Sequence, residues 1–181
     1  MNRRGFLHAS LAMGAGSLGA LSARAQSSPL GTVVEASLVT TSGRTRSLSQ
    51  LRGKTVVLFY ETRGAINVNQ HVKDAMGRRF NADRALANRF ALVAACNVAE
   101  YNTWPSRYFA GQAIATVANS NHLELWLDWD RTMITRLGMH DNASNIALID
   151  RNGRFHHHQW GRVANNAVDP LLDRMVALAN A

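Results

Sequence analysis

The sequence predicts an α/β fold, a three-layer α/β/α sandwich with a mixed sheet, on three observations. The apolar runs at residues 55–60 and 91–98 show no polar alternation, which is typical of strands buried on both faces. Segments with helical spacing lie between such runs, and alternating strands and helices favour a sheet covered on both sides. Near the C-terminus, Asp-Arg-Asn-Gly at residues 150–153 predicts a hairpin, which gives the sheet an antiparallel part.

The first elements of the chain follow from local composition. Residues 33–40 are rich in β-branched and apolar side chains, which favours a strand, and residues 42–44 (Ser-Gly-Arg) favour a turn. Residues 47–54 are typical of a short helical turn or loop, with a glycine near its end. We expect the next strand, 55–60, to lie in the middle of the sheet.

The middle of the chain alternates between helical and extended patterns. Apolar residues recur at helical spacing over 67–80, and this helix continues or restarts over 81–89. Residues 91–98 form a second central strand. A further helix is expected over 103–117, where Pro105 suits a first-turn position.

The last third of the chain predicts strands, a hairpin and a closing helix. Apolar residues alternate with more polar ones at 123–129, as in a half-buried strand. The remaining elements are a short helix at 132–137, hairpin strands at 146–149 and 154–160, and a C-terminal helix whose apolar face spans 171–178.

The first 25 residues have the three parts of an export signal and are set apart from the fold. Arg3 and Arg4 supply the charged start, residues 6–21 form a Gly/Ala-rich apolar stretch, and residues 23–25 (Ala-Arg-Ala) supply a small-x-small cleavage site. Residues 26–32 are then a short polar lead-in, and residues 33–181 are expected to form one domain.

The leader also contains a translocation motif. Asn-Arg-Arg-Gly-Phe-Leu at residues 2–7 resembles the twin-arginine motif. We therefore expect the twin-arginine export machinery to be a partner of the leader, cleavage to occur near Ala25, and the mature chain to lie in the periplasm or outside the cytoplasmic membrane. The alternatives are a chance basic start and an uncleaved membrane anchor, which the glycines and serines of the stretch disfavour.

Charge and cysteine content narrow the function classes. The formal charge of +8 includes three leader arginines and no leader acids, which leaves +5 for the rest of the chain. No run of Lys or Arg occurs, so the sequence does not favour a nucleic-acid partner. Cys96 is the one cysteine, so the chain has no internal disulfide and cannot run a dithiol cycle alone.

Three strings carry a family resemblance. They are SLSQLRGKTVVLFY at residues 47–60, LDWD through LGM at 127–139, and IALIDRNGRF at 146–155. In their order and spacing they resemble the thioredoxin superfamily, nearest to its peroxiredoxin-like and periplasmic thiol-reductase-like branch. The resemblance covers about residues 30 to 180. It implies a thioredoxin-like fold with a C-terminal β-hairpin plus helix, and it is specific for fold rather than activity.

The resemblance places the family's chemistry where the central strand turns into the next helix, and the sulfur is missing there. Active members carry Cys-x-x-Cys or a single peroxidatic Cys at this junction, because a helix N-terminus lowers the pKa of a thiol. Residues 60–67 read YETRGAIN, and if Thr62 matches the peroxiredoxin threonine, Ala65 stands in the nucleophile's place. The family's cis-proline position falls on Ser144, so we expect an all-trans loop there.

These departures predict an emptied active site, which we call the candidate groove (residues 61–67 and 142–145). We assign no catalytic residue and predict no cofactor, and expect the groove to bind an envelope protein or a small ligand. The residues chosen for it are Glu61, Thr62, Arg63, Gly64, Ala65, Ser144 and Asn145.

Two enzymatic or metal-binding alternatives stay open. Cys96, whose apolar strand favours a structural role, can instead serve a one-cysteine oxidoreductase that uses an external thiol, or form a disulfide with a partner. His156 and His158 share one face of a regular strand and can bind a metal with a third ligand. The candidates for that ligand are His122, His140 and Asp128.

Two further side-chain roles are weighed against a structural one. Glu61 and His71 can act as an acid–base pair, although a capping or surface role is favoured. Trp126 falls on the face of its strand opposite to the leucines, which is the face expected to carry polar residues. An exposed tryptophan there would indicate a contact surface.

Overall fold

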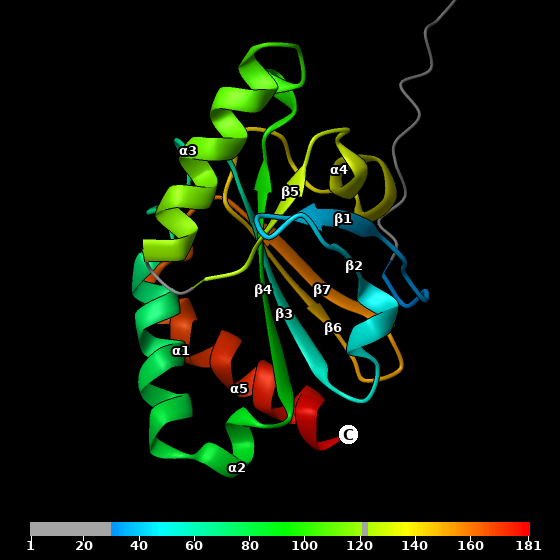
Figure 1. Cartoon of the computed structure of the whole chain (residues 1–181). Helices are drawn as coiled ribbons and strands as arrows, with labels where there is room; N and C mark the ends of the chain where they lie inside the picture. The colour runs from blue at the N-terminus through cyan, green and yellow to red at the C-terminus, as the bar shows by residue number, and fades with distance from the viewer. Residues whose placement is uncertain (1–29, 121–122) are drawn as a thin grey trace, which may run out of the picture.

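A mixed sheet of seven strands organises the domain, in the order β2-β1-β5-β4-β3-β6-β7 (Figure 1). The computed structural model describes residues 30–120 and 123–181; the expected export signal, residues 26–29 of the lead-in and His122 lie outside them. The strands are β1 (Ser37–Thr40), β2 (Thr45–Ser47), β3 (Thr55–Glu61), β4 (Phe90–Asn97), β5 (Leu125–Asp128), β6 (Asn145–Ile149) and β7 (Phe155–Trp160).

The middle of the sheet is parallel and its margins are antiparallel. Strand β4 pairs in parallel with both β3 and β5. Strands β6 and β7 add antiparallel pairs on one side, and β1 and β2 do so on the other. All seven residues of β3 are buried, as the unbroken apolar pattern predicts. The carboxyl ends of β3, β4 and β5 therefore meet at one edge of the sheet, where the candidate groove lies.

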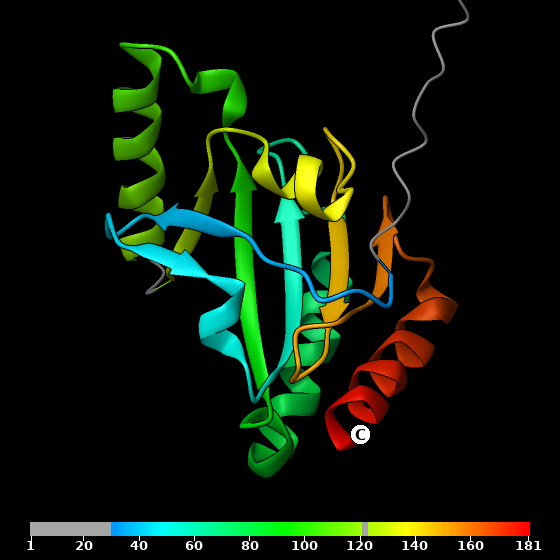
Figure 2. The ribbon, with the colours of Figure 1, turned by 90° about the vertical axis from the view of Figure 1, so that its right-hand side faces the viewer.

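Helices cover both faces of the sheet. They are α1 (Gln70–Ala82), α2 (Arg84–Ala87), α3 (Ser106–Ser120), α4 (Thr132–Leu137) and α5 (Val168–Asn180). Val57 and Phe59 pack with α1 and α5 on one face, while Leu58 and Tyr60 pack with α4 on the other (Figure 2). The predicted thioredoxin-like α/β fold, with its mixed sheet, C-terminal hairpin and closing helix, is confirmed. None of the helices in the described part of the chain is long and apolar enough to cross a membrane.

Three local features differ from the expectation. Residues 45–47 form β2, a strand too short to produce a periodic pattern, and Leu48–Leu51 follows as a 3-10 helix. The first strand begins at Ser37, and Val33 makes an isolated bridge to Arg154. Helix α1 begins at Gln70 rather than near residue 67.

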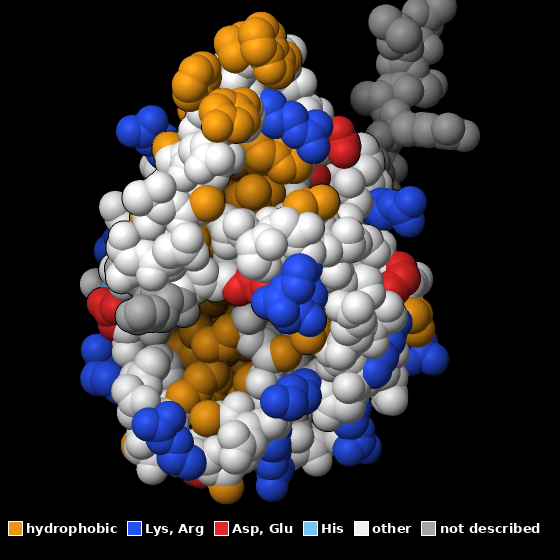
Figure 3. Space-filling model, in the orientation of Figure 1, with side chains coloured by type: hydrophobic (Ala, Val, Ile, Leu, Met, Phe, Trp, Pro, Cys, Tyr) orange, Lys and Arg blue, Asp and Glu red, His pale blue; other side chains and the backbone are white. Residues whose placement is uncertain are grey.

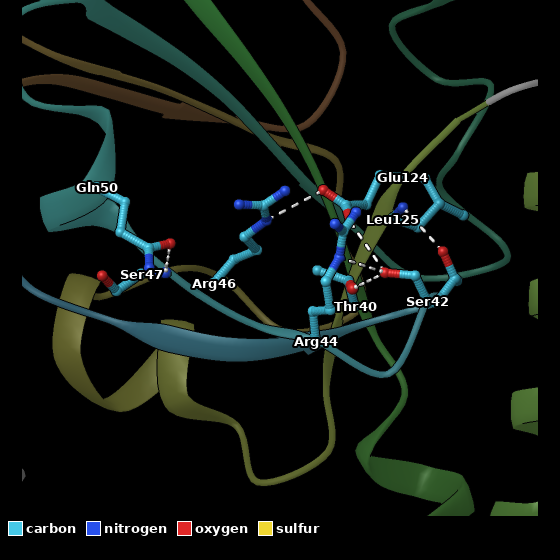
Figure 4. A network of polar contacts seen from close by, with 9 residues as sticks. Thr40, Ser42, Arg44, Arg46, Ser47, Gln50, Glu124 and Leu125 are labelled. Atoms are coloured by element: carbon cyan, nitrogen blue, oxygen red, sulfur yellow. Dashed lines mark hydrogen bonds and ion pairs between the residues drawn. The ribbon is translucent and has the colours of Figure 1, made fainter.

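A surface network ties the β1–β2 hairpin to the start of β5. The Glu124 carboxylate accepts hydrogen bonds from Arg44 Nη2 (2.9 Å) and Arg46 Nε (3.3 Å), as Figure 4 shows. Ser42 Oγ donates to the same carboxylate at 3.0 Å. The Arg44 side chain is 65% exposed, so water competes for these contacts and their contribution to stability is small.

Candidate functional site

The turn between β3 and α1 starts at the buried end of the central strand. The N–H of Ala65 donates to the Thr62 carbonyl (2.9 Å), and the N–H of Val68 donates to the Ala65 carbonyl (3.0 Å). The Ala65 side chain is buried, Thr62 is half-buried, and Arg63 and Gly64 are exposed. The residues predicted for the groove thus divide into a buried set, which we call the floor, and an exposed set, which we call the rim.

Glu61 forms the centre of the floor. Its side chain is 7% exposed and makes an ion pair with Lys73, whose Nζ lies 2.6 Å from Oε2. The Ser144 hydroxyl donates to Oε1 at 2.6 Å. A buried carboxylate is costly without a countercharge and hydrogen bonds, and Glu61 has both.

Lys73 reaches this carboxylate from the first turns of α1. Its Nζ also donates to the Ile66 carbonyl (2.8 Å) and lies 5.2 Å from the centroid of the Phe59 ring. The ammonium is therefore held by a carboxylate, a carbonyl and the face of an aromatic ring. Lys73 was not among the residues predicted for the groove, since no local pattern pairs it with Glu61, 12 positions earlier in the sequence.

Ser144 occupies the position that the resemblance assigns to a cis-proline. It is 1% exposed and accepts a hydrogen bond from Asn69 Nδ2 at 3.0 Å. Within residues 30–120 and 123–181 the one cis peptide bond is Trp104–Pro105, so the loop containing Ser144 is all-trans, as predicted. The serine presents a hydroxyl to Glu61 where the family has an apolar ring.

Asn69 links the start of α1 to the far side of the groove. Its Nδ2 also donates to the Gly161 carbonyl (2.8 Å), and its Oδ1 accepts from the N–H of Val163 (2.8 Å). The side chain is fully buried and makes no helix-capping bond. Asn69 is the N-cap residue of α1, and its three side-chain bonds tie this end of the helix to Ser144, Gly161 and Val163.

Asn145 is a structural member of the predicted set. Its Nδ2 donates to the carbonyls of Tyr60 (3.1 Å) and His140 (2.9 Å), and its Oδ1 accepts from the N–H of His140 (2.8 Å). Because the side chain is fully buried and these atoms are satisfied, Asn145 shapes the loop and does not face a ligand.

Arg63 lies on the exposed rim, next to the segment that follows β4. It contacts the phenol of Tyr101, which also contacts Glu100. The hydrogen bond from Tyr101 to the Glu100 carboxylate raises the pKa of the phenol, and Arg63 opposes that shift. The rim of the groove therefore includes residues from the β4–α3 connection.

Cys96 lies much closer to the groove than its sequence position indicated. In the parallel register of β3 and β4, Cys96 is the direct partner of Glu61. Burial, together with the Glu61 carboxylate, raises the pKa of the Cys96 thiol to about 11, and Lys73 opposes this shift. The thiol is therefore protonated near neutral pH, while only a thiolate is a good nucleophile. Its apolar surroundings, the small cluster under α3, favour a structural role.

Strand β7, which carries His156 and His158, lacks the regular alternation of side chains between its two faces on which the metal prediction depends. The register steps from Leu148 opposite His157 to Ile149 opposite Phe155, so His156 is the extra residue of a bulge. His156 Nε2 lies 2.9 Å from Asp150 Oδ2, whereas His158 Nε2 lies 3.0 Å from Asn145 Oδ1. The bulge thus gives the two rings separate partners.

No cluster of three or more His, Cys, Asp or Glu side chains able to hold a metal ion exists among the described residues. Of the expected third ligands, His140 lies 6.2 Å from His158 between ring centroids, and Asp128 instead accepts from Tyr60 at 3.0 Å. Burial lowers the pKa of His158 to about 4, with further contributions from His140 and His157.

Two other expected roles also change. The surface or capping role favoured for Glu61 over an acid–base pair with His71 is wrong, because Glu61 is buried and contacts Ser144 and Lys73, while the His71 ring bonds the Val163 carbonyl at 2.9 Å. The suggested exposure of Trp126 is wrong, since it is 5% exposed. Both faces of β5 are covered, and Trp126 packs in the core with α4.

Comparison with solved structures places this geometry in a known fold. The chain is similar to a thiol:disulfide interchange protein DsbE, described as putative, from Chlorobium tepidum, with 20% identity, a TM-score of 0.61, and coverage of 83% of this chain and 97% of that one. It is also similar to the exposed lipoprotein thioredoxin Etrx1 of Streptococcus pneumoniae, with 14% identity, a TM-score of 0.55, and coverage of 80% and 99%.

A third similar structure is a secreted disulfide oxidoreductase of Mycobacterium tuberculosis, with 15% identity, a TM-score of 0.53, and coverage of 79% and 96%. No protein-family model matches the sequence, and no curated protein matches it. At these identities the likeness shows the thioredoxin-like fold alone. With a single cysteine, loss of the dithiol chemistry named for these neighbours is plausible on chemical grounds.

Proposed function

We propose that this chain is an exported, non-catalytic binding module of the cell envelope, built on the thioredoxin-like fold without its thiol chemistry. The observation that carries the proposal is the network of Glu61, Lys73 and Ser144, which joins the cysteine-free turn after β3 to the loop where the resemblance places the cis-proline. A carboxylate, an ammonium and a hydroxyl that satisfy one another stabilise this edge of the fold. They supply no group that can exchange a disulfide.

Cys96 does not replace the missing thiols in this proposal. Its pKa of about 11 keeps the thiolate fraction very small near neutral pH. Cys96 also pairs with Glu61 across β3 and β4, and the negative charge of Glu61 opposes formation of a thiolate. Both effects act against nucleophilic attack by Cys96.

The exposed surface at this end of the sheet supports a protein as the bound partner. Trp104, Tyr108 and Phe109 are 87%, 60% and 65% exposed, and we call these three residues the aromatic tip. Figure 3 shows apolar side chains gathered at the top of the molecule, over the start of α3. Exposed aromatic clusters are typical of protein contact sites, and Arg63 on the groove rim adjoins the same connection through Tyr101.

Export is supported by the leader and by the neighbours. The expected twin-arginine signal at residues 1–25 predicts a periplasmic or extracytoplasmic chain. Two of the similar structures are described as an exposed lipoprotein and as a secreted protein. An envelope protein is therefore the partner that we propose, with a small ligand in the groove as the alternative.

Site-specific photocrosslinking in the producing cell tests the proposal. We expect a photoreactive residue at Ile66 or Tyr108 to capture the same envelope protein, and one at Arg84, at the other end of the sheet, to capture none. With that partner purified, Trp104→Ala and Arg63→Ala should weaken binding without changing the unfolding midpoint. Equal capture from all three positions, or affinity unchanged in both variants, would contradict the proposed surface.

The competing functions predict different measurements. A one-cysteine oxidoreductase would turn over with an external thiol and lose that activity in Cys96→Ser. A metal-binding protein would carry stoichiometric metal when purified without a tag and lose it in His156→Ala and His158→Ala. The proximity of Cys96 to Glu61 and Lys73 is the observation that favours testing the first of these.

A further inference from the structure

A second candidate site lies at the opposite end of the sheet from the candidate groove. A cavity of about 360 Å³ is bounded by the start of β3, the α2–β4 junction, the β6–β7 turn and the end of α5. Three cationic side chains from the first three of these segments line it: Lys54, Arg89 and Arg151. No Asp or Glu is among the residues that line this cavity. We call it the basic cavity.

In the described part of the chain, none of these three cations pairs with an Asp or Glu side chain. Every ion pair found in residues 30–120 and 123–181 involves other cations, such as Arg44, Lys73 and Arg79. Like charges that share one cavity repel each other, and an anion between them would remove that repulsion. A cluster of this kind therefore favours a negatively charged ligand.

The two arginines are oriented while most of their donors stay available. Arg89 Nη1 donates to Asn180 Oδ1 (2.5 Å), and Arg151 Nη2 donates to the main-chain oxygen of Ala181 (3.0 Å). A guanidinium has five N–H donors, so each bond uses one and fixes the plane of the group. Guanidinium groups held in this way match the geometry of phosphate oxygens.

The backbone around the cavity is fixed by neighbouring strands. The N–H of Gly53 donates to the Arg151 carbonyl (2.9 Å), and the N–H of Thr55 donates to the Arg89 carbonyl (2.9 Å). These two bonds join the three segments that carry the cations. Lys54 lies between Gly53 and Thr55, so its position relative to both arginines is set by the sheet.

We propose that the basic cavity binds a phosphoryl oxyanion through Lys54, Arg89 and Arg151. The source is either free phosphate or the phosphate of a phospholipid headgroup, because both present the same oxygens. A phosphate monoanion or dianion suits three cations without a carboxylate, and the cavity is wide enough for it. The site is separate from the candidate groove and does not depend on the function proposed there.

The test compares the full chain with three variants of the same length, each of which lacks one cation of the basic cavity. Lys54→Gln, Arg89→Gln and Arg151→Gln each remove one charge from the basic cavity. Arg136→Gln removes one charge from the exposed surface of α4 and is the matched control. Unfolding curves for all variants confirm that the fold is retained, and Lys54→Gln keeps the test valid if an arginine variant does not fold, since Lys54 is exposed.

Two probes distinguish the sources. Calorimetric titration with inorganic phosphate measures the free anion, and sedimentation with phosphatidylglycerol vesicles, against phosphatidylcholine vesicles, measures the headgroup. We expect each cavity variant to weaken at least one of these interactions by about fivefold or more, as when a charge-assisted hydrogen bond is lost at a surface site. Arg136→Gln should change the affinity for either probe by less than about twofold.

Binding of phosphate alone would assign the site to a free anion, and binding of anionic vesicles alone would assign it to headgroups. Either result supports the proposal if the cavity variants weaken binding to that probe and Arg136→Gln does not. Absence of binding to both probes would overturn it. An equal loss in all four variants would also overturn it, because that would report net charge rather than a site.

Discussion

Replacing Lys73 by Met tests whether the Glu61–Lys73 pair stabilises the floor of the candidate groove. The substitution keeps an unbranched side chain beside Phe59 but leaves the Glu61 carboxylate, 7% exposed, without its ammonium. Breaking a buried ion pair from one side costs about 3 to 5 kcal/mol. Because the Lys73 side chain is 22% exposed, we expect a loss of about 2 to 4 kcal/mol in the free energy of unfolding.

Urea unfolding at neutral pH measures this loss. The matched control is Arg44→Met, which removes a cation from the exposed Glu124 pair in Figure 4 and should cost about 1 kcal/mol or less. The double variant Glu61→Gln/Lys73→Met should recover part of the loss, since an amide is less costly to bury than an unpaired carboxylate. If Lys73→Met costs no more than Arg44→Met, the reasoning about this network is refuted.

Three other predictions concern single side chains. Alkylation of Cys96 by iodoacetamide should be slow at pH 7 and accelerate as the pH approaches about 11, and rapid labelling at pH 7 would contradict the burial argument. Between pH 6.5 and about 4 the unfolded chain takes up a proton at His158 that the folded chain does not, so the free energy of unfolding should fall as the pH falls through that window. In His158→Gln, the free energy of unfolding, measured with urea, should depend less steeply on pH in this window. An unchanged pH dependence would contradict the lowered pKa of His158. Asn145→Ala should cost about 2 to 4 kcal/mol by the same method, because it leaves buried carbonyls and the N–H of His140 without partners; a cost below about 1 kcal/mol would contradict the structural role.

The strands and helices were predictable because their signals are local. The apolar run of β3 and the helical spacing of α1 depend only on neighbouring residues, and both elements are present, although α1 begins at Gln70 rather than near residue 67. The bulge at His156 and the short strand β2 were not predictable, since a bulge depends on the register with a partner strand and three residues are too few for a period.

The site was only partly predictable for a related reason. The absence of sulfur in residues 60–67 is a property of the sequence, and these residues form the turn between β3 and α1 in the structure, whereas a ligand-binding role for the groove stays a prediction. The contacts of Glu61 with Lys73 and Ser144 join residues 12 and 83 positions apart, which a single sequence does not pair. Cys96 is close to Glu61 only because β3 and β4 pair in parallel with this register.

Trp126 shows how a correct pattern can give a wrong exposure. Leu125 and Leu127 alternate with Trp126, which is consistent with a strand that has one apolar and one wet face. The domain covers both faces of β5, with α3 on one side and α4 on the other, so all of these residues are buried. Exposed aromatic residues lie instead at the aromatic tip, where Trp104 precedes α3 and Tyr108 and Phe109 lie in its first turn.

The central claim is that the thioredoxin-like fold of this chain has lost thiol-redox catalysis, and a turnover assay tests it most directly. Purified chain is supplied with dithiothreitol and insulin, and separately with an external thiol and hydrogen peroxide, beside its Cys96→Ser variant. The account predicts that both proteins give the same rate as buffer in both assays. Insulin reduction or peroxide consumption that Cys96→Ser abolishes would contradict it.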